Sequence, residues 1–232
     1  MKRIAIIPAR GGSKRIPNKN SKLFHGKPII AYSIEVALNS ELFDEVMVST
    51  DDPQIAKIAL EFGAKVPFLR SEKNSDDFAT TVDVLLEVLD CYKENKVNFQ
   101  QATCIYACAP FITSKLLNQS FNLLNENNCD CVFPSIAYSH PIQRAIFIGS
   151  KGKVENFDFQ NSNIRTQDFT QAFYDAGMFY TFDVNKLFLT KNLRTNNTFS
   201  IEIQDIYAQD IDNENDWILA ELKYNLFKNA KL

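Results

Sequence analysis

Histidine is scarce in this sequence, and its cysteines do not form an even set. Only His25 and His140 occur among the 232 residues, so a metal site built from several histidines is not expected. The five cysteines lie mostly in apolar runs, which favours free buried thiols over disulfides or zinc ligands. Cys108 could serve as a nucleophile, but no histidine lies near it in the sequence, and we interpret it as a buried thiol.

Long apolar segments and two common nucleotide-binding motifs are also absent. No apolar run approaches the roughly 20 residues that span a bilayer, and the amino terminus lacks the apolar region of a signal peptide. We therefore expect a cytoplasmic protein with no membrane partner. The GxGxxG motif of a nicotinamide-dependent dehydrogenase is missing, and so is the GxxxxGK[ST] motif of P-loop NTPases.

Negative charge is missing from the start of the chain. Eight basic residues precede Glu35, the first acidic one, although the whole chain has 25 basic and 28 acidic residues and a net charge of -3. The overall balance argues against a general nucleic-acid or membrane-surface binder. The local excess of cations instead suits a compact polyanion such as a nucleotide.

The first twenty residues, MKRIAIIPARGGSKRIPNKN, contain this cationic segment. Residues 4–7 form a short apolar run typical of a buried strand, and Gly11-Gly12 permits a sharp turn and close approach to a ligand. Backbone amides of such a turn can hold phosphate oxygens, while basic side chains supply positive charge. The segment is predicted to be a triphosphate-binding loop at the carboxyl end of a strand, with Arg10, Lys14, Arg15 and Lys19 as its cations.

Short apolar runs alternate with amphipathic helical stretches along the first 137 residues. Such alternation predicts a parallel sheet covered by helices on both faces, with ligands beyond the carboxyl ends of the strands. Asp52, Pro53 and Gly63 mark the start and the end of one helix. The predicted strands are 4–7, 46–48, 66–69, 103–107, 131–136, 177–182 and 199–203. Helices are predicted to begin near residues 28, 53, 79, 183 and 213, and a further helix is indicated by Leu117, Phe121 and Leu124.

Residues 138–176 break this pattern. A hairpin is predicted from 145–148 and 154–157, and the polar stretch QNSNIRTQD follows it. Such a segment rarely forms its own core, so we expect it to pack against another subunit. The predicted organisation is a catalytic domain over 1–137 and 177–232 with a dimerisation insertion over 138–176.

Six ordered motifs carry a family resemblance: IPARGGSKRIPNKN, LRSEKNSDDFATT, YACAPF, HPIQR, RTQDFTQAFYDAGMFY and AQDIDNENDW. Together they cover nearly the whole chain, which resembles the CMP-nonulosonic acid synthetases, the family that includes CMP-sialic acid synthetase. The resemblance implies an α/β class protein with the three-layer α/β/α nucleotide-diphospho-sugar transferase (Rossmann-like) fold and a mostly parallel sheet. It also implies a cytidylyltransferase that joins CTP to a free nonulosonic acid, uses one or two Mg²⁺ ions, and forms a homodimer with shared active sites.

The resemblance further implies roles for individual residues. Arg10, Lys14, Lys19 and Asp210 would be catalytic, and Asp210 and Asp212 match the magnesium aspartates. The residues expected to bind the sugar are Tyr106, Cys108, Phe173 and Tyr180. His140, Gln143 and Arg165 are expected to reach toward the neighbouring subunit's sugar site. The residues expected to bind the nucleotide are Pro8, Ala9, Arg10, Gly11, Gly12, Ser13, Lys14, Lys19, Asn20, Arg70, Ala79 and Thr81.

The expected chemistry suits the two aspartates. When a sugar hydroxyl displaces pyrophosphate from CTP, charge accumulates on phosphate oxygens and must be neutralised. Mg²⁺ commonly takes one or two carboxylates plus phosphates and water, and Asp210 and Asp212 are spaced to point the same way from an extended strand. Asp210 and a metal-held hydroxide both remain candidates to take the anomeric proton.

Several of these residues also have a purely structural interpretation. Asp210 and Asp212 suit a turn or cap before the last helix, and Asp76 and Asp77 are interpreted as caps of the helix beginning near residue 79. The other structural alternatives are a solvated loop face for Lys14 and Arg15 and core positions for Phe173, Tyr174 and Phe179.

Departures from the sialic acid pattern bear on the sugar. Tyr106, Cys108 and Ile112 stand where that enzyme has glutamine, threonine and arginine, and Tyr174 and Ala176 replace an arginine and an asparagine. In this more apolar pocket a hydroxylated tail would leave buried polar groups unpaired, at about 1–3 kcal/mol each. Pseudaminic acid, with a terminal methyl and two acylamino groups, is therefore preferred over legionaminic or sialic acid. A sugar-1-phosphate nucleotidyltransferase and a non-catalytic nucleotide-binding module remain as alternatives.

Overall fold

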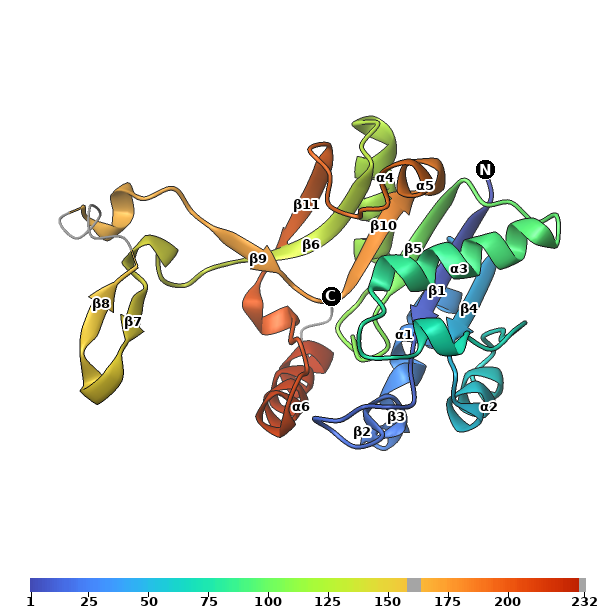
Figure 1. Cartoon of the computed structure of the whole chain (residues 1–232), viewed down its shortest axis with the longest axis horizontal. Coiled ribbons are helices and arrows are strands. Elements are labelled where there is room, and N and C mark those ends of the chain that lie inside the picture. Colours follow the sequence, from blue (N-terminus) through green and yellow to red (C-terminus); the bar gives the residue numbers. More distant parts are fainter. Residues whose placement is uncertain (158–163, 230–232) are drawn as a thin grey trace.

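One twisted sheet forms the centre of the computed structural model, which describes residues 1–157 and 164–229 (Figure 1). The strand order is β11-β6-β10-β5-β1-β4, and β9 pairs with β6 beside this path. Residues 158–163 of the predicted insertion lie outside the described residues. The strands are β1 Arg3–Pro8, β4 Glu45–Ser49, β5 Gln101–Ile105, β6 Cys131–Ala137, β9 Phe173–Asp175, β10 Phe179–Asp183 and β11 Thr198–Ile203.

The sheet is mostly parallel, as predicted. β1 pairs in parallel with β4 on one side and β5 on the other, and β6 pairs in parallel with β11. β10 runs antiparallel to both β5 and β6. Because β10 is reversed, its first residues lie at the same edge of the sheet as the last residues of β1 and β5.

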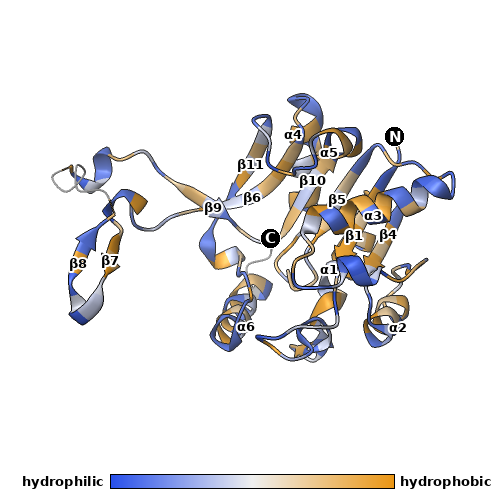
Figure 2. Cartoon of the chain, in the orientation of Figure 1, coloured by the Kyte–Doolittle hydropathy of each residue, from blue (hydrophilic) through white to orange (hydrophobic). Residues whose placement is uncertain are grey.

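Helices cover both faces of the sheet, because side chains of a buried strand alternate between two apolar layers. In β1, Ala5 and Ile7 pack in the layer that contains residues of α1 and α6, whereas Ile4 and Ile6 pack in the layer that contains residues of α3 and α5. Figure 2 shows the corresponding concentration of hydrophobic residues along the central strands. The helices are α1 Ile29–Asn39, α2 Pro53–Glu61, α3 Thr81–Glu94, α4 Ser114–Glu126, α5 Val184–Thr190 and α6 Glu214–Asn229.

Helix α2 begins and ends where the sequence predicted. Asp52 Oδ1 accepts hydrogen bonds from the Gln54 and Ile55 amides at 2.7 and 3.3 Å, and Pro53 occupies the first helical turn. Gly63, with a φ of +89°, follows the helix in the left-handed conformation that glycine adopts without strain.

Two local predictions were wrong. Residues 66–69 form no strand, and only Lys65 makes a bridge, to Met47, because Pro67 has no amide to donate to a neighbouring strand. Helix α3 starts at Thr81 and is capped by Thr80 in a reciprocal capping box with Asp83, not by Asp76 or Asp77. Thr80, three residues closer to the helix than Asp77, accepts the Asp83 amide instead.

The predicted insertion projects from the main body (Figure 1). Its hairpin consists of β7 Ile146–Ile148 and β8 Val154–Asn156, close to the predicted limits. Strand β9, which was not predicted, then returns to pair with β6. A further small hairpin joins β2 Leu23–Phe24 to β3 Lys27–Pro28. Among the described residues, no helix has the length and apolar character needed to cross a bilayer.

Candidate active site

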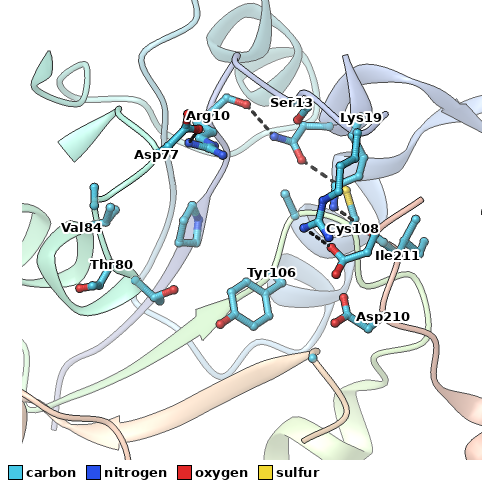
Figure 3. Close-up of a pocket in the computed structure, with 18 of the residues that line it drawn as sticks. Arg10, Ser13, Lys19, Asp77, Thr80, Val84, Tyr106, Cys108, Asp210 and Ile211 are labelled. Atoms are coloured by element: carbon cyan, nitrogen blue, oxygen red, sulfur yellow. Dashed lines mark hydrogen bonds and ion pairs between the residues drawn. The ribbon is translucent and has the colours of Figure 1, made fainter. Parts of the chain in front are cut away.

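A cavity of about 600 Å³ lies at the edge of the sheet where β1 and β5 end and β10 begins. Arg10 and Asp210, which come from opposite ends of the chain, both line it (Figure 3). The predicted site residues that line the cavity are Pro8, Arg10, Ser13, Lys14, Lys19, Asn20, Arg70, Ala79, Thr81, Tyr106, Cys108, Tyr180, Asp210 and Asp212.

Other predicted residues do not line this cavity. Gly11 and Gly12 lie in the same loop, and Ala9 is buried behind it. Phe179 is fully buried, so the core interpretation holds for that residue, whereas Tyr174 is partly exposed. The predicted sugar residues His140, Gln143, Arg165 and Phe173 do not line the cavity of their own chain. The first three lie in the projecting segment, and Phe173 begins β9, which pairs with β6.

The loop after β1 is held tightly against the start of α2. Gly11 donates its amide proton to Asp51 Oδ1 at 3.1 Å, and a Cβ on Gly11 would lie 2.6 Å from Asp52 Oδ2. The Asn20 side-chain amide donates to the Arg10 carbonyl at 2.9 Å. These contacts define the path of the loop, and so the position of its cations.

Two of the cations face an acidic residue across the cavity mouth. Arg10 Nη1 donates to Asp77 Oδ1 at 2.8 Å and to the Asp76 carbonyl at 2.9 Å, and Lys14 pairs with the other oxygen of Asp77. Hydrogen bonds from Lys14 and then Arg10 lower the pKa of Asp77. Asp77 therefore balances the charge of two side chains that were predicted to bind phosphate, and does not cap α3. Asp76 Oδ1 accepts hydrogen bonds from the Phe78 and Ala79 amides.

Two other basic residues of the loop reach the segment before α6. Lys19 Nζ donates to the Ile211 carbonyl at 2.6 Å, and Arg15 Nη2 lies 2.8 Å from Asp212 Oδ1. Arg15 therefore pairs with the late segment and Lys14 pairs across the cavity mouth. Both side chains are also largely exposed to solvent, at 70% and 76%, in agreement with the alternative of a solvated loop face.

Asp210 and Asp212 are not the cap of α6. Asn213 Oδ1 accepts the Asn215 and Asp216 amides at 2.9 and 3.1 Å, so Asn213 caps the helix. The two aspartates lie in an irregular segment, not in a strand as expected, and both border the cavity. Partial burial, followed by the neighbouring Asp212 carboxylate, raises the pKa of Asp210.

This pair of carboxylates fits a magnesium ion better than a metal held by protein alone. The described residues contain no group of three or more histidine, cysteine, aspartate or glutamate side chains arranged to hold a metal. Mg²⁺ needs only one or two carboxylates when phosphates supply further ligands. A cation would also relieve the mutual repulsion that raises the pKa of Asp210.

The far wall of the cavity is formed by buried polar groups. Arg70 is 8% exposed and donates from Nε to Ser49 Oγ at 3.0 Å, with Nη2 bonded to the Ser49 carbonyl. Burial raises the pKa of Tyr106 and that of Cys108 to about 12. A thiol with a raised pKa is a poor nucleophile, which argues against a nucleophilic role for Cys108. Its side chain is only partly buried and lines the cavity, so the expectation of a buried thiol does not hold for this cysteine.

The sequence analysis missed two residues beside the cavity. Asp175 lines it, and the Asp175 carboxylate pairs with Arg194 and with the Tyr180 hydroxyl. Asp175 lies within a quoted motif, between the two positions that were singled out as departures. No signal in the sequence pointed to Arg194, because the pair joins residues 19 positions apart in different elements.

The sequence model of the cytidylyltransferase family matches residues 4–229 of this chain. The chain belongs to the cytidylyltransferase family. A relative named pseudaminic acid cytidylyltransferase, from Campylobacter jejuni, is 42% identical over 192 residues, which is 83% of this chain and 82% of the relative. A second relative, named CMP-N,N'-diacetyllegionaminic acid synthase, from Legionella pneumophila, is 41% identical over 48% of each chain.

Solved structures show the same fold. The structure of CMP:2-keto-3-deoxy-manno-octonic acid synthetase complexed with CTP has a TM-score of 0.71, with 19% sequence identity. The match covers 99% of this cytidylyltransferase chain and 100% of that one. The nucleotide-diphospho-sugar transferase fold predicted from the sequence is confirmed.

Proposed function

We propose that this protein joins CTP to a free nonulosonic acid, with pseudaminic acid as the preferred sugar, and releases pyrophosphate. The observation that carries the proposal is the cavity in which the cations of the β1 loop lie opposite Asp210 and Asp212. The 42% identical relative named for pseudaminic acid supports the choice of sugar.

In the proposed reaction the anomeric hydroxyl oxygen attacks the α-phosphorus of CTP. A new P–O bond forms, the bond from the α-phosphorus to the bridging oxygen breaks, and pyrophosphate leaves. Arg10, Lys14 and Lys19 neutralise the charge that develops on the phosphate oxygens. Asn20, Arg70, Ala79 and Thr81 hold the cytosine and ribose, with the backbone of the β1 loop.

Asp210 and Asp212 would hold Mg²⁺ together with phosphates of the nucleotide. The ion supplies charge neutralisation at the reacting phosphate. Asp210 is the carboxylate of this chain that we assign to accept the anomeric proton, because it lines the cavity together with the cations of the β1 loop.

Legionaminic acid is the second candidate sugar, because the Legionella relative is 41% identical over about half of this chain. A panel of free pseudaminic, legionaminic and sialic acids, each supplied with CTP and Mg²⁺, separates these substrates by the rate of pyrophosphate release. Preference for sialic acid would contradict the proposed sugar. Turnover of sugar 1-phosphates in place of the free acids would instead identify a sugar-1-phosphate nucleotidyltransferase.

Replacement of Asp210 tests the catalytic proposal. Asp210→Ala is expected to keep CTP affinity within a few-fold, because the cations of the β1 loop remain, and to lower magnesium-dependent pyrophosphate release by about 10³-fold or more. Binding is measured by calorimetry and release by a coupled assay. Glu202→Ala, which removes an exposed carboxylate on β11, is the control. Unchanged release by Asp210→Ala would overturn the catalytic role assigned to Asp210.

We also propose that the projecting segment docks on a second copy of the chain and completes its site. The apolar side chains of the hairpin are exposed, with Phe147 58% and Ile148 74% accessible. His140, Gln143 and Arg165 lie in this segment, away from the cavity of their own chain. In a twofold dimer they would reach the partner's sugar pocket.

A further inference from the structure

An ionic cluster forms part of the cavity wall next to the proposed sugar site. The Asp175 carboxylate, 17% exposed, accepts hydrogen bonds from the Tyr180 hydroxyl and from Arg194 Nη2 through the same oxygen. Arg194 Nη2 also lies 3.4 Å from the Tyr180 oxygen, and its guanidinium carbon is 4.9 Å from the centre of the Phe133 ring. The side chain of Asp175 is therefore held in one orientation from several sides.

The cluster adjoins the proposed metal aspartate. Asp175 Oδ1 accepts the Gly177 amide at 2.9 Å, and a Cβ on Gly177 would lie 3.1 Å from Asp210 Cγ. A sugar with its anomeric oxygen near Asp210 would thus extend along Asp175, Tyr180 and Tyr106, which all line the cavity. The rings of Tyr106 and Tyr180 are in edge contact, with their centres 6.1 Å apart.

The chemistry of this wall matches an acylamino group. An ionised carboxylate can accept about four hydrogen bonds, and three are made to Gly177, Tyr180 and Arg194, so one acceptor position remains. Burial, then the hydrogen bond to Asp175, raises the pKa of Tyr180, which keeps its hydroxyl a donor. An acylamino group carries one N–H to donate and a methyl to pack on aromatic surface.

We propose that Asp175 accepts the N–H of an acylamino substituent of the sugar and so selects for that substituent, with Arg194 as the residue that positions Asp175. Asp175 is then a substrate-binding residue, whereas Arg194 acts through it. Arg194 also balances the charge of Asp175, so that the carboxylate does not repel an anionic sugar. This inference rests on the proposed function and extends it to the chemical group that is recognised.

The test compares a nonulosonic acid bearing two acylamino groups with analogues in which each group in turn is replaced by a hydroxyl. For the unmodified protein, one of the two replacements is expected to raise the sugar KM about tenfold. In Asp175→Ala, the parent sugar is expected to show this higher KM and the replacement to make no further difference. The CTP KM stays within about twofold, which reports that the nucleotide site is intact.

Variants of Arg194 test whether this residue positions Asp175 or only stabilises the fold. Arg194→Ala is expected to reproduce the KM effect of Asp175→Ala, and Arg194→Lys to restore part of it. Lys186→Ala, which removes a neighbouring cation that pairs with Asp130 at 3.7 Å, is the control and is expected to leave the sugar KM unchanged. If the unmodified protein discriminates between the sugars and Asp175→Ala discriminates equally, this inference alone is overturned. No turnover of any free nonulosonic acid by the unmodified protein overturns the proposed function, and this inference with it.

Discussion

At Gly11 the first loop has no space for a side chain. A Cβ there would lie 2.6 Å from Asp52 Oδ2 and 2.9 Å from Asp52 Cβ, and Asp52 is fixed because it caps α2. At Gly12 no atom lies within 4 Å of the corresponding position. The adjacent glycines therefore differ: close packing on α2 requires the first, and the second faces open space.

Alanine at these two positions should have different effects on stability. Gly11→Ala is expected to lower the free energy of unfolding by about 1–3 kcal/mol, because the new methyl group must displace the capping side chain. Gly12→Ala is expected to change it by less than about 0.5 kcal/mol. Urea unfolding of both variants without nucleotide measures the difference. Equal destabilisation would show that the Asp52 contact does not limit the loop.

The segment between residue 70 and α3 crosses the mouth of the cavity and places an anion on its cations. Asp77 binds Arg10 and Lys14, the two side chains assigned to the nucleotide phosphates. CTP must displace this carboxylate before its phosphates can use both cations. The segment therefore competes with the nucleotide by an electrostatic contact that is exposed to solvent.

Removal of that charge should strengthen CTP binding. Asp77→Asn is expected to lower the CTP dissociation constant about two- to fivefold, which is the range of an exposed ion pair. Glu72→Gln removes a charge from the same segment without touching Arg10 or Lys14, and serves as the control. Titration calorimetry at low and high salt measures both variants. Weaker binding by Asp77→Asn would instead make Asp77 a ligand of the bound complex.

On the scale of the whole molecule, one part of the chain has almost no contact with the core. The β7–β8 hairpin exposes Ile146, Phe147, Ile148 and Val154, each more than half accessible. Figure 2 shows hydrophobic residues on β7, far from the central sheet. Exposed apolar surface of this kind is characteristic of an interface.

A charge on the hairpin should separate the proposed dimer. Phe147→Asp is expected to reduce the mass in solution from twice the 26.5 kDa chain to that of one chain, and to lower the sugar kcat/KM because Arg165 no longer reaches the partner's site. Leu189→Asp, at a 79% exposed position on α5, is the control. Light scattering and pyrophosphate release are measured together. A dimer that survives Phe147→Asp would place the interface elsewhere.

Many of the helices and strands could be predicted from residues that are close together in the sequence. Apolar runs predicted most of the strands of the central sheet, and Asp52, Pro53 and Gly63 predicted the limits of α2, because capping and glycine conformation depend on neighbours in the chain. The ordered motifs indicated the family and a cationic loop. The prediction of a strand over residues 66–69 failed because an apolar run containing Pro67 cannot form a regular ladder.

Only the tertiary structure determined which charged residues pair with one another and which share the cavity. It reverses β10 between two parallel neighbours, and so brings Tyr180 to the edge where β1 ends. The segment that follows β11 brings Asp210 to the same cavity. It also pairs Asp77 with the loop cations and Asp175 with Arg194. Periodicity and capping are set by residues a few positions apart, whereas ion pairs between distant elements depend on how the sheet is assembled. The sequence therefore determined the elements and the residue types of the site, and the assembled sheet determined their partners.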